Sequence, residues 1–503
     1  MRDRSVDADL SFAQRRLWFL DQLAPGSAEY VIPYAFRVRG VFDIGVLESA
    51  FSGVLGRHEV LRTRFAVDGE GEPVQVVDPS SELKISVIDL GEEPDPVERE
   101  RVAFELAERE ASLGFDLAAG RLVRVTVVSL SVDEHLLLVS MHHVVADGWS
   151  MGVLARELRE FYAAGLEGRD VDLPQLPVQY ADFAVWQREW LSGEVLERQL
   201  VFWREQLAGL EPLELPTDRP RPLVRSSAGG AVRFGVSADV ARRLSGIATW
   251  QSASLFMVGL AAFQVVLSRW SGQDDVAVGS PIAGRNRAEV EDLVGFFVNE
   301  LVMRSDLSDN PSFTDLLGRV RETALGAYEH QDLPFERLVE DLAPERDLSR
   351  NPLFQVSFVL QNFEDGEWVL PGLEMEPVEV ATTISKFDLI LSLTERSDGG
   401  LDGEVVFSSE LFDESTAARL AGHFVRVLES VSADPGQRVG QIDLLSEAER
   451  RQILVEWNDT AVPFADDVAV HQLVEAQAAR TPDAVAVVCG EEQLTYAQLN
   501  TRA

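Results

Sequence analysis

Residues 141–150 read Met-His-His-Val-Val-Ala-Asp-Gly-Trp-Ser, which places two imidazoles and a carboxylate in one short segment. The apolar run Leu136 to Val139 just before it predicts a strand, and Asp147-Gly148 predicts a turn. A helix is expected over Met151 to Ala164, with Ser150 as its N-cap. The segment thus predicts a strand, a turn and a helix start in close succession.

His143 is expected where that strand ends and the turn begins. An imidazole titrates near neutrality, so it can accept a proton, donate one or orient an attacking amine. Spacing alone leaves a second interpretation open, in which His142 and His143 are two ordinary histidines in a turn.

The pattern His-His-x-x-x-Asp-Gly resembles the signature of nonribosomal peptide synthetase condensation domains and of their relatives in the chloramphenicol acetyltransferase-like superfamily. Six further segments resemble that family in chain order: residues 11–20, 57–65, 180–187, 279–287 with its continuation 293–299, 330–336 and 349–355. Together with the histidine motif they make seven motifs, which are far more specific than any one of them.

The resemblance implies an α/β fold with two chloramphenicol acetyltransferase-like lobes arranged as a V-shaped pseudodimer, with the histidines at their junction. The chain alternates strand and helix patterns, among them a strand expected over Leu83 to Val87 and an apolar helix expected over Leu255 to Trp270. With proline-bearing linkers and a change of pattern near residue 450, these patterns suggest three regions. They are an N-terminal lobe over residues 1–175, a C-terminal lobe over 176–450, and a linker with the truncated start of an adenylation domain over 451–503. The third region is assigned because residues 481–487 and 494–500 resemble the opening of an adenylation domain.

The resemblance also implies a reaction. An acyl or peptidyl thioester on the phosphopantetheine arm of an upstream donor carrier protein is attacked by the amine of an aminoacyl thioester on a downstream acceptor carrier. Holding both tethered substrates in line supplies much of the rate. No cofactor is expected to be bound covalently, and the adenylation domain of the same synthetase is an expected partner.

By resemblance, His143 contacts the attacking amine as a base or as a hydrogen-bond positioner, and the sequence leaves the two roles open. A backbone N–H near Gly148 is a candidate for stabilising oxyanion charge, because a helix start presents unpaired amides. His142 is expected to point away from His143 if strand alternation persists. Trp149 lies in the same motif and is expected to support the site.

Asp147 is a candidate to orient His143, but the resemblance favours an ion pair with Arg285 that braces the loop. Asn299 and Asn351 lie in later family motifs and are expected to support the site. Arg16 is expected to brace a lobe through hydrogen bonds of its guanidinium.

The chain departs from the family at Glu300, where many members have threonine after Phe-Val-Asn. This carboxylate is a candidate second acid/base group, for example for eliminating the β-hydroxyl of a bound seryl or threonyl group. The alternative is a solvated charge at a strand edge or a residue that sets acceptor specificity.

The composition argues against several kinds of partner and bound group. A formal charge of −39 disfavours nucleic acid as a partner. The single cysteine, Cys489, excludes an internal disulfide and fits a cytoplasmic location. No apolar run approaches membrane-spanning length, and the histidines lack metal-ligand spacing, so neither a membrane association nor a metal is expected.

The sequence disfavours four alternatives to amide formation. The Trp149-Ser150 continuation and the expected adenylation start disfavour an epimerisation domain, and the adenylation start disfavours an acyltransferase that uses coenzyme A. The intact histidine motif disfavours a non-catalytic recruitment platform and a heterocyclising variant, which would carry an aspartate-based motif.

Overall fold

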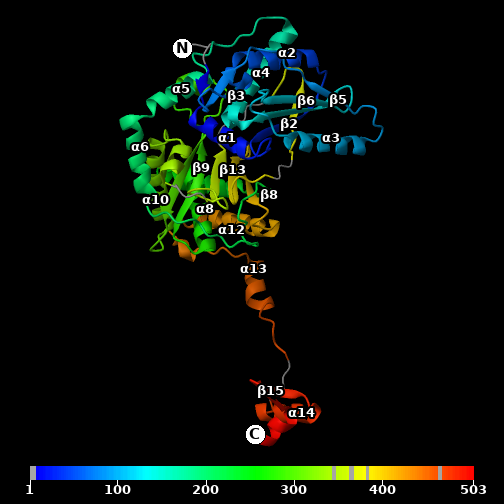
Figure 1. Ribbon diagram of the computed structural model, residues 1–503, viewed down its shortest axis with the longest axis vertical. Coiled ribbons are helices and arrows are strands. Elements are labelled where there is room, and N and C mark those ends of the chain that lie inside the picture. The colour runs from blue at the N-terminus through cyan, green and yellow to red at the C-terminus, as the bar shows by residue number, and fades with distance from the viewer. Residues whose placement is uncertain (1–6, 343–346, 362–367, 381–383, 463–466) are drawn as a thin grey trace. The chain divides into compact units, whose positions relative to one another are not determined.

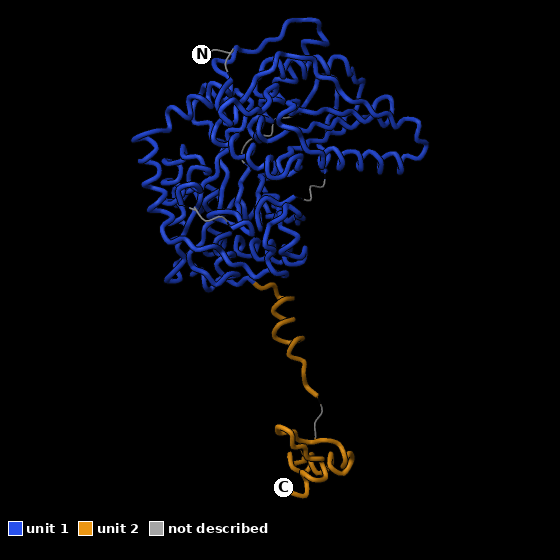
Figure 2. The backbone as a smooth tube through the Cα atoms, viewed as in Figure 1, with its two compact units in different colours: residues 1–444 blue, residues 445–503 orange. Residues whose placement is uncertain are grey.

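The computed structural model describes residues 7–342, 347–361, 368–380, 384–462 and 467–503. The chain divides into two compact units, residues 1–444 and residues 445–503 (Figure 2). The larger unit contains two lobes, and each lobe has its own main sheet and its own large buried apolar cluster.

The first lobe is built on a five-stranded sheet in the order β12-β2-β7-β6-β5. β2, β7 and β6 are antiparallel neighbours, and β5 is parallel to β6. A smaller sheet, in the order β1-β4-β3, is built from strands that lie between Ala8 and Val77. The strands are β1 (Ala8–Asp9), β2 (Val31–Arg39), β3 (Thr63–Val67), β4 (Pro73–Val77), β5 (Ser86–Asp89), β6 (Val123–Ser129) and β7 (Glu134–His142).

Helices cover both faces of the five-stranded sheet (Figure 1). On β7, Leu136 and Leu138 pack with α3, whereas Leu137 and Val139 belong to the cluster that includes α2 and α4. Because successive side chains of a strand point to opposite faces, a strand covered on both sides needs a continuous apolar run. The helices are α1 (Phe12–Leu23), α2 (Ile44–Arg57), η1 (Glu59–Arg62), α3 (Pro96–Ala111), η2 (His143–Val145) and α4 (Gly148–Glu167).

The second lobe is built on a six-stranded mixed sheet in the order β10-β9-β11-β13-β14-β8. α10, α8 and α12 pack against it, and α8 is buried along most of its length. The strands are β8 (Gly229–Val236), β9 (Asp275–Ile282), β10 (Asn299–Asp306), β11 (Val356–Gln361), β13 (Leu389–Glu395) and β14 (Leu401–Ser408).

The helices of this half of the chain begin with a tryptophan-rich pair, α5 and α6, that follows the first lobe. Their bounds are α5 (Tyr180–Trp190), α6 (Gly193–Gln206), α7 (Ala238–Trp250), α8 (Leu255–Ser271), α9 (Ala288–Glu291), α10 (Phe313–Glu329), α11 (Phe335–Leu342), α12 (Glu414–Ala433) and η3 (Val439–Gln441).

Two segments of the second half pack into the first lobe. The crossing loop, residues 283–298, contributes Val290, Leu293, Val294 and Phe297 to the first lobe's core. The β12 arm, residues 368–377, ends in β12 (Glu374–Pro377), which pairs antiparallel with β2. Trp368 of this arm stacks on Phe36 with ring centroids 4.9 Å apart. The two lobes are therefore joined by shared packing as well as by the chain.

The smaller unit contains α13 (Glu447–Arg451), η4 (Gln452–Glu456), α14 (Val470–Arg480), β15 (Val485–Cys489), β16 (Glu492–Thr495) and α15 (Tyr496–Arg502). β15 and β16 form an antiparallel pair. Many of its apolar side chains, including Leu454, Trp457 and Val488, are exposed within the described residues.

The helix after the histidine motif differs from the expectation. α4 begins at Gly148, and its N-cap is Asp147 rather than Ser150, because an Asp147 Oδ1 accepts the Ser150 N–H at 2.9 Å. Aspartate and serine are both good N-caps and lie three residues apart here, so the sequence pattern fits either start.

The strand expected over Leu83 to Val87 also begins later, at Ser86. The Leu83 and Ile85 N–H groups donate to side chains of α2, the Ser52 hydroxyl and a Glu48 carboxylate, instead of to a neighbouring strand. The apolar alternation that predicted this strand therefore reflects burial against a helix.

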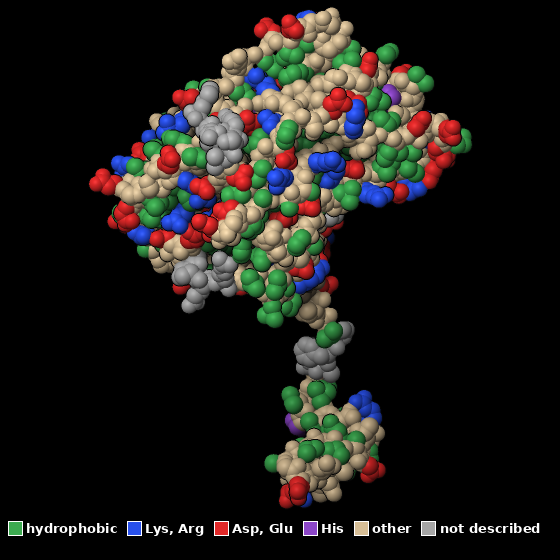
Figure 3. Space-filling model, turned by 45° about the horizontal axis from the view of Figure 1, so that its top comes forward, with side chains coloured by type: hydrophobic (Ala, Val, Ile, Leu, Met, Phe, Trp, Pro, Cys, Tyr) green, Lys and Arg blue, Asp and Glu red, His purple; other side chains and the backbone are tan. Residues whose placement is uncertain are grey.

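The surface carries both signs of charge. Figure 3 shows acidic and basic side chains together over the viewed face of the larger unit. Among the described residues, no single helix is long and apolar enough to cross a bilayer; α7 and α8 meet the length and composition test only as a pair, with a bend of 106° between them.

Candidate active site

His143 is the first residue of η2, directly after β7. Its N–H donates to the Tyr30 carbonyl at 2.8 Å, which fixes its backbone against the start of β2. Its Nδ1 lies 3.1 Å from the Ala146 carbonyl oxygen, which can only accept, so Nδ1 carries the proton. Nε2 is then left with a lone pair for a substrate.

Burial lowers the pKa of His143 well below its ordinary value. The charge of Lys386 and the neighbouring His142 lower this pKa further, against the hydrogen bond to Ala146. The ring is therefore neutral at neutral pH and suited to accept a hydrogen bond. The His143 ring is therefore a weak base.

His142 has different neighbours. Its Nδ1 accepts the Val144 N–H at 3.1 Å, and its ring meets the edge of Phe115. Burial, followed by the charge of Lys386, lowers the pKa of His142 to about 3. These contacts hold the turn after β7 and place His142 in the packing of the first lobe.

Asp147 forms the ion pair that the sequence predicted. Its Oδ1 lies 3.0 Å from Nη2 of Arg285, and both side chains are almost completely buried. Ser150 Oγ donates to the same Oδ1 at 2.7 Å, and Asp147 Oδ2 accepts the Phe297 N–H at 2.9 Å. Arg285 also donates to the carbonyls of Val290 and Leu293, both at 2.7 Å. The pair therefore binds α4 to the crossing loop.

Three further side chains anchor the crossing loop, and sequence reasoning gave none of them this role. Ser150 Oγ, whose single hydrogen is donated to Asp147, accepts the Gly295 N–H at 3.1 Å. His58 Nδ1 accepts the Val294 N–H at 3.3 Å, and its Nε2 lies 2.7 Å from Glu157 Oε2. The Tyr180 hydroxyl donates to the Phe296 carbonyl at 2.6 Å. Their hydrogen-bonding side chains were visible in the sequence, but their partner loop was not.

Phe296, which this network positions, lies against His143. The rings of His143 and Phe296 are edge to face, with centroids 5.3 Å apart. The crossing loop thus forms one wall beside His143.

Gly148 and Trp149 open α4. The Gly148 N–H lies in the first helical turn, where N–H groups have no intrahelical acceptor. Trp149 is partly exposed, and its indole N–H donates to the Glu291 carbonyl at 3.0 Å, so it supports the crossing loop instead of touching His143.

The two asparagines brace segments around the site. Asn299 Nδ2 donates to the carbonyls of Gln331 and Leu333, and its Oδ1 accepts the Phe335 N–H. Asn351 Nδ2 donates to the Lys386 carbonyl at 2.7 Å. Each asparagine therefore fixes the backbone beside an ionisable residue, Glu300 in the first case and Lys386 in the second.

Glu300 is not the solvated charge that one interpretation of the sequence expected. It lies on β10, an edge strand, but its Oε2 is shielded from solvent and has no hydrogen-bond partner. Burial raises the pKa of Glu300 to about 7, although the charges of Arg16 and Lys386 lower it. A carboxyl of this kind is half-protonated near neutrality.

Lys386 is the site residue that sequence reasoning missed. Its Nζ lies 5.0 Å from the centroid of the Tyr30 ring, and Tyr30 is the residue whose carbonyl accepts the His143 N–H. Burial lowers the pKa of Lys386, against the charges of Glu29 and Glu300. A signal existed: of the 45 basic residues, only Lys84 and Lys386 are lysines.

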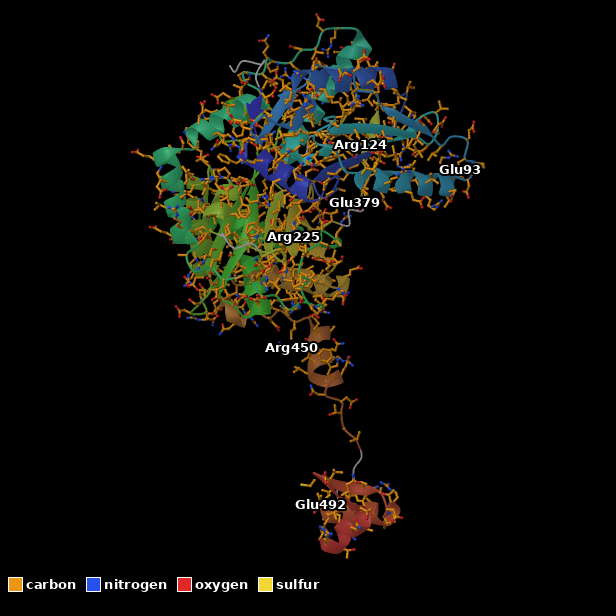
Figure 4. The ribbon with its side chains drawn as sticks, in the orientation of Figure 1. Glu93, Arg124, Arg225, Glu379, Arg450 and Glu492 are labelled. Carbon is orange, nitrogen blue, oxygen red and sulfur yellow. The ribbon has the colours of Figure 1, made fainter. Side chains whose placement is uncertain are left out.

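Two ion pairs join the lobes near these groups. Arg16 of α1 lies 3.3 Å from Glu336 of α11. Arg225 lies where the lobes meet (Figure 4), with Nη2 3.0 Å from Glu29 Oε1 and Nη1 3.3 Å from the Lys386 carbonyl oxygen. Arg16 thus bridges two lobes instead of bracing one.

A pocket lies beside the crossing loop. Its lining comes from α1, α5, the crossing loop, the start of β10, the segment before α11 and α11 itself, and includes Trp186, Phe296, Asn299 and Glu336. Within the described residues, no three His, Cys, Asp or Glu side chains come together as metal ligands.

Two α/β lobes, with His143 beside the crossing loop, have the chloramphenicol acetyltransferase-like pseudodimer fold. The family model described as "Condensation domain" matches residues 5–454, and the chain belongs to this family, the condensation domains of nonribosomal peptide synthetases.

The curated relatives are much longer than this chain. A linear gramicidin synthase from Brevibacillus parabrevis is 46% identical over 505 residues, which cover 100% of this chain and 6% of that protein. Bacitracin synthase 3 of Bacillus licheniformis is 39% identical over 495 residues, which cover 98% of this chain and 8% of that protein. The chain thus spans a small part of such synthetases.

Solved structures confirm the predicted fold class. The X-domain from teicoplanin biosynthesis has a TM-score of 0.80 at 32% identity, covering 88% of this chain and 99% of that one. The four-domain nonribosomal peptide synthetase holo-AB3403 has a TM-score of 0.84 at 21% identity, covering 98% of this chain and 38% of that one. The second likeness concerns the fold alone.

Proposed function

We propose that the chain joins two carrier-bound substrates through an amide bond. The observation that carries this proposal is the neutral, partly buried His143, whose Nδ1–H is engaged and whose Nε2 lone pair is left for a substrate. A ring of this kind orients an attacking amine by accepting one of its N–H groups.

In the proposed step, the nitrogen of the acceptor's neutral amine attacks the donor's thioester carbonyl carbon. The C–N bond forms, the C–S bond breaks, and the amine proton ends on the departing sulfur, so an amide and a thiol result. His143 positions the amine, and the Gly148 N–H is the proposed donor to the oxyanion. The low pKa of His143 favours positioning over full proton removal.

The partners follow from the family and remain part of this proposal. The substrates are thioesters on phosphopantetheine arms of an upstream donor and a downstream acceptor carrier protein. Residues 451–503 are proposed as the linker and first residues of an adenylation domain in the same synthetase.

The test loads donor and acceptor carriers with simple aminoacyl groups and follows the products by intact-protein mass spectrometry. His143→Ala should slow amide formation at least about 100-fold. His471→Ala, at an exposed position of the smaller unit, is the matched control and should leave the rate unchanged. Equal rates in all three proteins would refute the role of His143, and no product from the wild type would favour a recruitment platform.

A second candidate activity is dehydration of a bound seryl or threonyl group, which the shielded Oε2 and the raised pKa of Glu300 favour. Here ionised Glu300 would take the α-proton and deliver it to the departing β-hydroxyl, so that the Cα–H and Cβ–O bonds break, the C=C bond forms and one water leaves. A product lighter by one water would support this activity. Glu300→Gln should then abolish dehydration and spare amide formation, whereas equal loss of both would contradict it.

A further inference from the structure

Glu300 and Lys386 ionise to opposite charges, and the Lys386 ammonium lies over the ring of Tyr30 instead of beside a carboxylate. Among the described residues, no ion pair or hydrogen bond is recorded for either charged end, and the two groups interact only through their charges. A buried acceptor without a hydrogen bond costs about 1 to 3 kcal/mol, so Glu300 Oε2 needs a donor that the protein does not supply.

Both residues are held by rigid backbone. Asn299, the neighbour of Glu300, binds the 331–335 segment through three hydrogen bonds and also accepts the Glu300 N–H at 3.0 Å. The Lys386 carbonyl accepts from Asn351 at 2.7 Å and from Arg225 at 3.3 Å. Groups fixed in this way are preorganised for a ligand.

Lys386 lies near His143. The Lys386 ammonium is over Tyr30, whose carbonyl holds the His143 backbone, and its charge lowers the pKa of His143. A group that contacts Lys386 is therefore close to the reacting atoms.

The local charges are already balanced. Arg16 pairs with Glu336, Arg225 pairs with Glu29, and Glu300 opposes Lys386. An additional full charge would upset this balance, and an apolar group would leave Glu300 Oε2 without a partner. A neutral group that both donates and accepts satisfies both residues, since it donates to the carboxylate and accepts from the ammonium.

We propose that Glu300 and Lys386 form a side-chain subsite, which takes the hydroxyl or carboxamide of a carrier-bound aminoacyl group. This inference rests on the proposed function, because it assumes that carrier-bound aminoacyl groups enter the site. The side chain belongs to the donor or to the acceptor, and the experiment separates these sources.

The experiment compares nearly isosteric pairs, threonyl against valyl and asparaginyl against leucyl, on the acceptor carrier with a fixed alanyl donor. The same pairs are then placed on the donor carrier with a fixed alanyl acceptor. In one of the two arrangements, the polar member should react at least about 10-fold faster, the factor that corresponds to one unpaired buried group.

Glu300→Leu and Lys386→Met should each reduce that preference toward one, and Glu300→Leu should also raise the valyl or leucyl rate. Glu395→Leu and Lys84→Met are the matched controls, because both residues are exposed and lie outside the site, and they should keep the wild-type preference. If Glu300→Leu does not fold, Glu300→Gln tests the carboxylate with little change of shape.

The outcomes separate the two proposals. Equal rates for polar and apolar members in both arrangements, with amide still formed, would overturn the subsite and leave the proposed function in place. No amide from any pair would overturn the proposed function and, with it, the subsite. A preference that survives both Glu300→Leu and Lys386→Met would overturn the assignment to these residues.

Discussion

At the scale of single residues, burial shifts the pKa of the ionisable groups at the site in the direction that favours their neutral forms. Burial pushes the pKa of His143 down and that of Glu300 up, and Lys386 also has a lowered pKa. Loss of water disfavours the charged form of each group, whichever sign it has. The chemistry beside His143 is therefore set by removal of solvent as much as by the choice of side chains.

Glu300 should make stability fall as pH rises. Its pKa is about 7 in the folded state against an ordinary 4.5, so between these values the folded state binds more protons than the unfolded state. The stability of the wild type relative to Glu300→Gln should therefore decrease from pH 4.5 to 7 and level off above. Thermal unfolding of both proteins at several pH values measures this, and parallel curves would contradict the raised pKa.

Lys386 should become reactive at lower pH than an ordinary lysine, because burial lowers its pKa from 10.5. The acetylation rates of Lys386 and of Lys84, each normalised to its own high-pH plateau, are measured by peptide mass spectrometry. The midpoint of Lys386 should lie below that of Lys84, whose pKa is raised by hydrogen bonds to Glu48 and Glu82. Glu300→Gln should lower the Lys386 midpoint further, and coincident midpoints in the wild type would refute the assignment.

At the scale of elements, the crossing loop depends on one carboxylate. Asp147 caps α4 through one oxygen and holds the Phe297 N–H through the other, while it pairs with Arg285. The sequence motif marked this aspartate as important near His143. Its structural role is to join a helix to a loop of the other lobe.

Asp147→Ala should therefore destabilise the larger unit by about 3 to 5 kcal/mol, because it leaves the buried Arg285 charge uncompensated. Denaturant unfolding measures the loss. Asp292→Ala is the matched control, since this exposed residue pairs with the exposed Arg156 and should change stability by less than about 1 kcal/mol. Similar losses in both variants would contradict a buried pair.

The sequence predicted helices and strands well where the pattern of buried side chains matched the one that a helix or strand of that kind requires. β7 has a continuous apolar run, and the helix at Leu255 is apolar along its length, so both were predicted. The start of α4 was wrong because two capping residues compete, and the start of the strand at Leu83 was wrong because α2 supplies the hydrogen-bond acceptors. Such errors come from tertiary contacts that no local pattern contains.

The same limit applies to the site. The motif residues His143 and Asp147 could be found by resemblance, and the ion pair of Asp147 with Arg285 could be predicted. The roles of Lys386 and His58 could not be predicted, although His58 lies in a family motif and Lys386 is one of two lysines, because each role depends on which residues lie next to it in space.

At the scale of the whole molecule, the described chain has two units of very different packing. The larger unit has two extensive buried clusters, whereas among the described residues of the smaller unit the buried hydrophobic side chain is Ala478. A unit with so little buried apolar surface has little of its own to stabilise it.

Removing residues 445–503 should therefore leave the unfolding midpoint of residues 1–444 unchanged. Differential scanning calorimetry of the 503-residue chain and of residues 1–444 tests this. A midpoint lower by several degrees in the shorter protein would show that the smaller unit stabilises the larger one, contrary to the division into two compact units.

The β12 arm has a consequence for engineering. It adds a strand to β2, and Trp368 stacks on Phe36, so sequence-distant parts of the chain have to match. A hybrid synthetase that takes residues 1–175 from one parent and the remainder from another would join a strand edge and an arm that did not evolve together. Exchange units for recombination should therefore keep residues 1–444 intact and place the splice point beyond Leu444.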